Sequence, residues 1–290
     1  MSPLKSAKFV KFVKFVKAHA LGNDFLLVDR KELPIPDEWP ALARSLCHRR
    51  RGIGADGIVI FEARQGPSFS MTLLNQDGSH AEISGNGLRC LGAYLRFSGW
   101  TSESEFSVET GSGTRRLQLI EEEGSRFVFR AAMGVPHLAS REIPFQLEPP
   151  QERVVQVPLE VEGRTFLITA VSMGNPHCVT FVDRLDLNVL RELGPRMENH
   201  TRFPRKTNVE FVEVRSRSEI SIGIWERGAG ETGASGTGAA AAAVASILNG
   251  KTDETVTVVC PGGELKVDWN DRREVFVTGE AVVVAEGVVR

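Results

Sequence analysis

The sequence has no long apolar run and almost no net charge. Its longest apolar stretch, residues 238–248, is shorter than the roughly 20 residues that a membrane-spanning helix needs. It contains 35 lysines and arginines against 37 aspartates and glutamates, a formal net charge of -2, so no general basic field attracts nucleic acid. We therefore expect neither a membrane nor a nucleic acid as a partner.

Cysteines are few, and the histidines are scattered. Cys47, Cys90, Cys178 and Cys260 lie far apart with no CxxC pair, and the six histidines show no HExxH or other zinc-ligand spacing. We therefore expect no disulfide framework and no metal site. The N-terminus lacks a continuous apolar segment followed by a small-residue cleavage site, so the sequence predicts a cytoplasmic protein.

The chain does contain enough apolar material for one or two cores, because 41% of its 290 residues are hydrophobic and 25% are charged. This length exceeds the usual size of one domain. A Lys-Phe-Val repeat occupies residues 8–16, and its period of three fits neither a strand nor a helix. We interpret its last copy as the start of the folded chain and leave residues 1 to about 12 outside the fold. A membrane-surface segment is the alternative.

Short strands dominate the remaining pattern, with two helices among them. Apolar runs that follow glycine-rich turns predict helices over residues 85–97 and 236–248. Strand hairpins mixed with few helices indicate an α+β fold rather than regular βαβ alternation. Segments rich in β-branched and aromatic residues predict strands at residues 25–28, 58–61, 127–129 and 256–259.

Both predicted helices begin with a Ser-Gly-X-Gly motif, at residues 84–87 and 235–238. This repetition predicts two structurally similar halves whose helix N-termini face a common cleft. A change of pattern around Met133 and Gly134 and a proline-containing stretch at residues 143–158 indicate the boundary between them. A helix N-terminus offers unpaired backbone N–H groups and partial positive charge, and glycine lets a ligand approach closely. Two such ends could hold a carboxylate or a phosphate, although serine is also simply a favoured N-cap residue.

Nucleotide-binding motifs fail on their spacing. Residues 236–241 fit GxGxxA, but no acidic residue follows to complete a βαβ unit. Residues 250–252 read Gly-Lys-Thr, but Ala245 stands where a P-loop requires its first glycine. Other polar turns supply amides, an arginine and a carboxylate, which suit a small zwitterion.

Six polar and glycine-rich motifs follow one another along the chain. They are Gly-Asn-Asp-Phe at 22–25, Arg-Gly-Ile-Gly-Ala-Asp-Gly at 51–57, Asn-Gln-Asp-Gly-Ser at 75–79, Ser-Gly-Asn-Gly-Leu-Arg-Cys at 84–90, Met-Gly-Asn-Pro-His at 173–177 and Glu-Arg-Gly-Ala-Gly-Glu-Thr at 226–232. In this order they resemble the diaminopimelate epimerase family, and the resemblance covers residues 15 to 286.

The resemblance implies two pseudo-symmetric domains, each a mixed β-sheet wrapped around a central helix, with the active site in the interdomain cleft. We place the N-terminal domain at residues 13–133, completed by about residues 278–290, and the C-terminal domain at residues 134–277. The implied activity is a cofactor-independent amino-acid epimerase that interconverts LL- and meso-diaminopimelate by two-base α-proton transfer. It belongs to lysine and cell-wall precursor synthesis, and the implied assembly is a homodimer.

The family moves the α-proton with two cysteines, one at each helix start, and these positions carry Ser84 and Ser235 here. A cysteine thiol has an ordinary pKa of about 8.5, which a helix N-terminus can lower, whereas a serine hydroxyl needs a separate base. Cys90 lies six residues beyond Ser84, more than one helical turn away, and is not an obvious substitute.

By resemblance, further residues hold the substrate and assist the proton transfer. His177 and Glu226 are candidate helpers, although a packed His177 is an equal alternative. The reacting carboxylate would bind the backbone at Gly85, Asn86, Gly236 and Thr237. The rest of the substrate would lie among Asn23, Asn75, Asn175, Asn208, Glu226 and Arg227.

The two serines leave two alternatives open. One is a different enzyme of the same fold, an isomerase or a dehydratase that removes a proton from one face only. The other is a catalytically impaired paralogue that still binds the ligand. The retained asparagines, together with Glu226 and Arg227, argue against a changed substrate, so we favour the epimerase.

Overall fold

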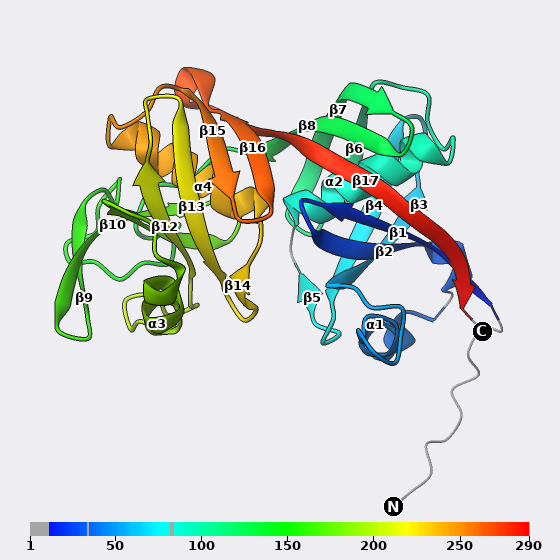
Figure 1. Ribbon diagram of the computed structural model, residues 1–290, viewed down its shortest axis with the longest axis horizontal. Helices are drawn as coiled ribbons and strands as arrows, with labels where there is room; N and C mark the ends of the chain where they lie inside the picture. The colour runs from blue at the N-terminus through cyan, green and yellow to red at the C-terminus, as the bar shows by residue number, and fades with distance from the viewer. Residues whose placement is uncertain (1–11, 34, 82–83, 290) are drawn as a thin grey trace, which may run out of the picture.

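The computed structural model describes residues 12–33, 35–81 and 84–289 (Figure 1). The first copy of the Lys-Phe-Val repeat and Lys11 of the second copy lie outside the described residues. The last copy lies in the first strand, β1 (Val13–Ala20), as expected. Within the described ranges, no helix combines the length and the apolar character that a membrane crossing requires.

In the N-terminal half, strands surround one helix. Its elements are β1, β2 (Asn23–Asp29), α1 (Trp39–Leu46), β3 (Gly57–Ala63), β4 (Ser68–Asn75), β5 (His80–Ala81), α2 (Gly85–Phe97), β6 (Glu105–Thr110), β7 (Gly113–Glu123) and β8 (Arg126–Gly134). Hydrogen bonds join the strands in the order β1–β2–β3–β4–β6–β7–β8. The last strand of the chain, β17 (Val275–Val289), pairs with both β8 and β1 and so closes a ring.

The helix α2 packs against β1, β2, β8 and β17 of this ring. All residues from Gly85 to Ala93 are buried. Leu88, Leu91 and Leu95 belong to the main hydrophobic core. This burial also takes the polar Asn86 and Arg89 out of water, and buried polar groups need hydrogen-bond partners inside the protein.

The C-terminal half has a second helix packed against a second run of strands. Its elements are β9 (Val157–Val161), β10 (Arg164–Ser172), β11 (Pro176–Val182), α3 (Leu187–Glu198), β12 (Asn208–Val214), β13 (Glu219–Glu226), β14 (Gly230–Thr232), α4 (Gly236–Leu248), β15 (Thr255–Cys260) and β16 (Gly263–Asp268). The strands pair in the order β9–β10–β11–β12–β13–β15–β16–β17. The alanine-rich α4 is buried from Gly236 to Ile247, and its small side chains let the strands approach closely.

The two halves repeat one order of elements. The series β1–β2–α1–β3–β4–β5–α2–β6–β7–β8 matches β10–β11–α3–β12–β13–β14–α4–β15–β16–β17. Parallel pairs occur at equivalent places: β2 with β3 and β4 with β6, then β11 with β12 and β13 with β15. The expected α+β class, with mixed strands around a central helix in each half, is confirmed.

The strand β17 connects the two groups of strands that Figure 1 shows side by side. Its residues 276–278 pair with β16, and its residues 282–289 pair with β1. The domain boundaries that we placed near residues 133 and 278 therefore fall inside β8 and β17. They stay predictions.

The helix predictions for residues 85–97 and 236–248 are confirmed by α2 and α4. The four predicted strands lie within β2, β3, β8 and β15. The sequence interpretation did not include α1 and α3. Both are amphipathic, and α1 buries Trp39, Leu42 and Leu46 while α3 packs against β12 and β13.

Candidate active site

The first turns of α2 and α4 are in contact. A Cβ atom added to Gly236 would lie 3.1 Å from Gly85 Cα, and one added to Gly85 would lie 3.2 Å from Gly236 Cα. Glycine at both positions therefore permits this close approach of two backbones. The two partial positive charges and the free N–H groups of the helix N-termini are brought to one place, which favours a bound anion.

Ser84 and Ser235 have the same conformation at the two helix starts. Ser84 has φ -138° and ψ 118°, and its Oγ accepts a hydrogen bond from Gly87 N at 3.0 Å. Ser235 has φ -138° and ψ 123°, and its Oγ accepts from Gly238 N at 3.2 Å. Each serine is thus an N-cap, and the two side chains occupy equivalent positions in the two halves.

Glu226 is the carboxyl group beside Ser235. It is the last residue of β13, and the hairpin to β14 brings Thr232 back to it, so that Thr232 Oγ1 donates to Glu226 Oε1 at 2.7 Å. Burial raises the pKa of Glu226, while hydrogen bonds from Thr232 and Ser235 oppose that rise. A carboxylate with a raised pKa is a stronger base, which suits it to accept a proton near neutral pH.

His177 is fully buried, and both of its ring nitrogens have partners. Nδ1 lies 2.7 Å from Glu210 Oε1, and Nε2 lies 3.0 Å from Asn175 Oδ1. The amide of Asn175 in turn donates from Nδ2 to Thr237 Oγ1 at 3.4 Å. With both nitrogens engaged, the imidazole is placed to fix the orientation of Asn175 beside the first turn of α4.

Glu210 is the residue that our sequence interpretation missed. It is fully buried in β12, and a Cβ atom added to Gly238 would lie 3.0 Å from its Oε1, so the carboxyl lies against the start of α4. Burial raises the pKa of Glu210, and His177 opposes that rise. The available signal was its place between the apolar Val209 and Phe211, which indicates a buried strand. An acidic residue is seldom fully buried without a partner, so Glu210 could be expected to have one.

Amide groups connect the start of α2 to both halves. Asn86 Nδ2 donates to Asn23 Oδ1 and to the backbone oxygen of Ala234, both at 3.1 Å. Asn23 Nδ2 donates to Asp56 Oδ2 at 2.7 Å. Ala234 immediately precedes Ser235, so Asn86 links the two helix starts directly.

A group of charges behind Asn23 holds the early loops in place. Asp24 pairs with Arg49 at 2.7 Å and with Lys17 at 2.9 Å, and Arg49 also pairs with Asp56 at 2.6 Å. Burial alone would raise the pKa of Asp24, but its hydrogen bonds with Arg49 and Lys17 outweigh this and lower it. The Asp24 carboxylate therefore remains charged and fixes Arg49, which in turn holds Asp56 against the Asn23 amide.

The remaining expected binding residues differ in their surroundings. Asn208 is buried, and both ends of its side-chain amide are hydrogen-bonded. Its Nδ2 donates to Pro176 O and its Oδ1 accepts from Arg227 N, both at 2.9 Å. Its amide therefore holds two loops together. Asn75 is exposed, and its Nδ2 donates to Ser79 Oγ at 3.0 Å. Nothing in the described contacts joins Asn75 to the two serines.

The cysteines of the chain do not supply a thiolate base in place of Ser84 or Ser235. All four are free and buried. Burial raises the pKa of Cys90, the cysteine on α2. Burial also raises the pKa of Cys260 to about 12, although its thiol accepts a hydrogen bond from the backbone of Ser235. Both thiols are therefore neutral near pH 7.

Across residues 12–33, 35–81 and 84–289, no group of three His, Cys, Asp or Glu side chains is arranged to hold a metal ion.

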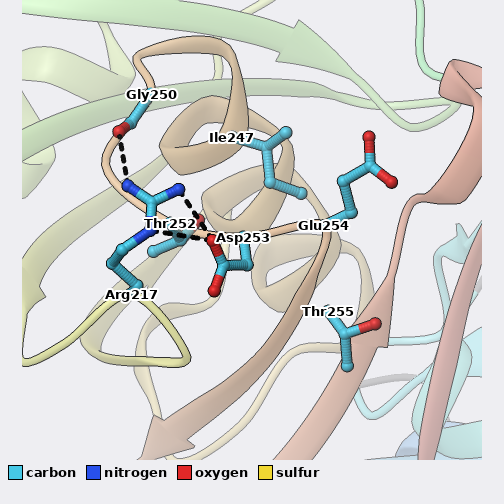
Figure 2. A pocket seen from close by; sticks show the side chains of 7 residues that line it. All are labelled: Arg217, Ile247, Gly250, Thr252, Asp253, Glu254 and Thr255. Carbon is cyan, nitrogen blue, oxygen red and sulfur yellow. Dashed lines mark hydrogen bonds and ion pairs between the residues drawn. The ribbon is translucent and has the colours of Figure 1, made fainter.

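A separate pocket lies at the other end of α4 (Figure 2). It is lined by residues such as Ile247, Gly250 and Thr252, and Arg217 Nε donates to Asp253 Oδ1 at 2.8 Å across it. Because α4 has 13 residues and a helix rises about 1.5 Å per residue, this pocket is far from Ser235. It is not part of the candidate active site.

Comparison with known proteins assigns a family to this geometry. The family model for diaminopimelate epimerase matches residues 15–139 and 169–284. A diaminopimelate epimerase from Pelotomaculum thermopropionicum is 47% identical over 272 residues, 93% of this chain and 96% of the relative. One from Desulfitobacterium hafniense is 43% identical over 278 residues, 94% of this chain and 96% of the relative.

Solved structures of the same fold come from more distant proteins. A hydroxyproline epimerase from Agrobacterium vitis superposes with a TM-score of 0.71 at 15% identity, covering 98% of this chain and 92% of the other. A phenazine biosynthesis protein of the PhzF family from Bacillus anthracis gives a TM-score of 0.68 at 16% identity, covering 97% and 99%. At these identities the likeness shows the fold alone.

Proposed function

The chain belongs to the diaminopimelate epimerase family, and we propose that it performs the family's reaction where α2 and α4 begin. It is an isomerase of lysine biosynthesis, and it interconverts LL- and meso-diaminopimelate, a small-molecule substrate. The observation that carries the proposed site is the contact between two Ser-Gly-X-Gly helix starts, one from each half. The family match over both halves supports it.

In this proposal the reacting carboxylate binds the free backbone N–H groups at Gly85, Asn86, Gly236 and Thr237. Helix N-termini stabilise an anion by hydrogen bonding and by their partial charge. They also stabilise the negative charge that develops when the α-proton leaves. The remainder of the substrate contacts the polar side chains that surround this junction, namely Asn23, Asn75, Asn175, Asn208, Glu226 and Arg227.

The proton transfer that we propose uses the two serines unequally. On one face, the Cα–H bond breaks and its proton passes to Ser235 Oγ, while the Ser235 hydroxyl gives its own proton to the Glu226 carboxylate. The electron pair stays on the substrate as a carbanion beside the helix N-termini. On the opposite face the Ser84 hydroxyl gives its proton to Cα and is reprotonated by water, while Glu226 returns its proton to solvent.

The step at Ser84 is the slow one in this scheme. Among the described residues, the hydrogen-bond partner of Ser84 Oγ is a backbone N–H, which cannot accept a proton. A serine hydroxyl is a weak acid without an adjacent base. Proton removal at the Ser235 face is therefore faster than the complete inversion of configuration.

We also propose that the enzyme works without a cofactor, in the cytoplasm and as a homodimer, with no membrane or nucleic-acid partner. We propose two domains: the N-terminal domain is residues 13–133 completed by residues 278–290, and the C-terminal domain is residues 134–277. Analytical ultracentrifugation of the full chain tests the homodimer directly.

The test of the proposed function is α-proton exchange from LL-diaminopimelate in deuterated water, followed by NMR. The double variant Ser84→Cys with Ser235→Cys is measured in parallel. Exchange by the unaltered chain supports a serine-assisted epimerase. Activity only in the cysteine variant identifies a catalytically impaired paralogue. A dehydrated product would favour the other enzymes of this fold, and absence of binding at millimolar ligand would contradict the proposal altogether.

A further inference from the structure

Arg89 is a fully buried arginine on α2 with few partners. Its side chain has 0% exposure and is among the largest buried side chains of the protein. Its Nη2 donates to Asn86 Oδ1 at 2.5 Å. Nε and Nη1 are buried and have no hydrogen-bond partner among the described residues.

The guanidinium group is charged and has no counter-charge in the described part of the chain. Burial lowers the pKa of Arg89 to about 10, so the group stays protonated at neutral pH. The titratable groups that act on it are the thiols of Cys90 and Cys260, which are neutral there. An isolated buried charge is strongly unfavourable, and such charges are normally paired.

The position of Arg89 suggests what the missing negative charge is. Its guanidinium reaches the first turn of α2 through Asn86, which also donates to Ala234 O ahead of Ser235. A Cβ atom added to Gly279 would lie 3.4 Å from Arg89 Cζ, so the group packs against β17 between the two halves. The Arg89 guanidinium therefore lies behind the place where the two helix N-termini meet. Its charge adds to their partial positive charges, so the positive potential at the junction is increased.

We propose that Arg89 is the buried counter-charge of the substrate's reacting carboxylate and positions Asn86 between the two helix starts. The inference rests on the proposed function, because it takes the carboxylate to lie at this junction. Arg89 does not touch the substrate. It acts as a positioning residue through Asn86 and through its charge, so that an anion at the junction relieves the repulsion among three positive ends.

The experiment compares binding of meso-diaminopimelate with binding of its analogue in which the reacting carboxylate is a carboxamide, by calorimetric titration. The unaltered chain should prefer the carboxylate by about tenfold or more, as expected for a charge-assisted contact. Arg89→Met should reduce this preference several-fold, because the N–H groups of the two helix N-termini remain, and Arg89→Lys, which keeps the charge, should restore part of it. Arg64→Met removes an exposed arginine that pairs with Glu62 at 3.2 Å and should keep the full preference.

The outcomes separate the inference from the proposed function. If the unaltered chain binds neither ligand, the proposed function is wrong and the inference fails with it. If the unaltered chain prefers the carboxylate and Arg89→Met prefers it equally, the inference alone is overturned. If Arg89→Met does not fold, the NMR resonance of the Arg89 Nε–H group in the unaltered chain tests the inference instead. It should shift on adding diaminopimelate but not the carboxamide, and equal shifts would overturn the inference.

Discussion

His177 Nδ1 lies 2.7 Å from Glu210 Oε1, and both side chains are fully buried. The two residues come from the parallel neighbours β11 and β12, so a rigid pair of strands fixes their distance. Because Nε2 of the same imidazole contacts Asn175 Oδ1, the pair determines which way the Asn175 amide faces. A buried acid–imidazole pair thereby orients an amide at the start of α4.

The first prediction concerns this pair. Glu210→Gln keeps the side-chain shape but replaces the acid–imidazole pair with a weaker neutral hydrogen bond. Because His177 offsets the burial of the Glu210 carboxylate, losing the pair should lower the free energy of unfolding by about 1–3 kcal/mol. It should also weaken ligand binding, because Asn175 loses its fixed orientation. Urea denaturation and calorimetric titration measure the two effects. Glu213→Gln on the same strand is the control, since Glu213 is only partly buried. Unchanged stability and affinity in Glu210→Gln would contradict the role of the pair.

The second prediction concerns the pH dependence of Glu226. Burial raises its pKa in the folded chain above the ordinary value of 4.5. Its contribution to stability is therefore present below pH 4.5 and is lost as the pH rises through the folded-state pKa. Glu226→Gln removes the cost of burying the ionised carboxylate, so the variant should be more stable than the unaltered chain at pH 7 and should lose this advantage below pH 4.5.

Thermal melts between pH 4 and 8 measure this difference between Glu226→Gln and the unaltered chain. The same variant should lose α-proton exchange, because it lacks the proposed base. A stability difference that does not change with pH would mean that Glu226 has an ordinary pKa. Retained exchange would mean that the base is another group.

The third prediction separates the two serines. Ser235→Ala removes the hydroxyl beside Glu226 and should slow α-proton exchange strongly. Ser84→Ala should leave exchange with retention of configuration at one stereoisomer while abolishing inversion. NMR measures exchange, and chiral separation of the products measures inversion. Both variants remove equivalent N-caps, at a cost of about 1 kcal/mol each, so each serves as the stability control for the other. Equal loss of exchange in both would contradict the unequal roles of the two serines.

The sequence predicted the features that depend on local chemistry. Both central helices were placed correctly because a capping serine and two glycines mark each start, and the repeated motif indicated two similar halves. By contrast, α1 and α3 were missed, and both contain proline, at Pro40 near the start of α1 and at Pro195 within α3. Proline is unfavourable in helix interiors, so Pro195 obscured the amphipathic pattern of α3, whereas Pro40 lies in the first turn, where proline is tolerated, and α1 with its eight residues is too short to show a clear helical period.

Residues whose role depends on tertiary contacts could not be predicted in the same way. His177 and Glu210 are 33 positions apart, and their contact follows from the pairing of β11 with β12. The resemblance indicated His177 as a helper in proton transfer, but nothing local to the sequence showed that both of its nitrogens are occupied. The complete burial of Arg89 likewise results from the closed ring of strands around α2.

The fourth prediction restores thiols at the two helix starts. In Ser84→Cys with Ser235→Cys, each new thiol lies at a helix N-terminus, which lowers its pKa from about 8.5 toward neutrality and makes it a far better base than serine. Each pKa unit gained is equivalent to about 1.4 kcal/mol, so the epimerisation rate should rise by about two orders of magnitude or more. The rate is measured under reducing conditions, because the two helix starts are in contact and the thiols could pair. Ser246→Cys is the matched control, since Ser246 is a buried serine of α4 that donates to Ala242 O at 2.8 Å, away from the junction. A rise in the control as well, or none in the double variant, would mean that the two serine positions do not limit the reaction.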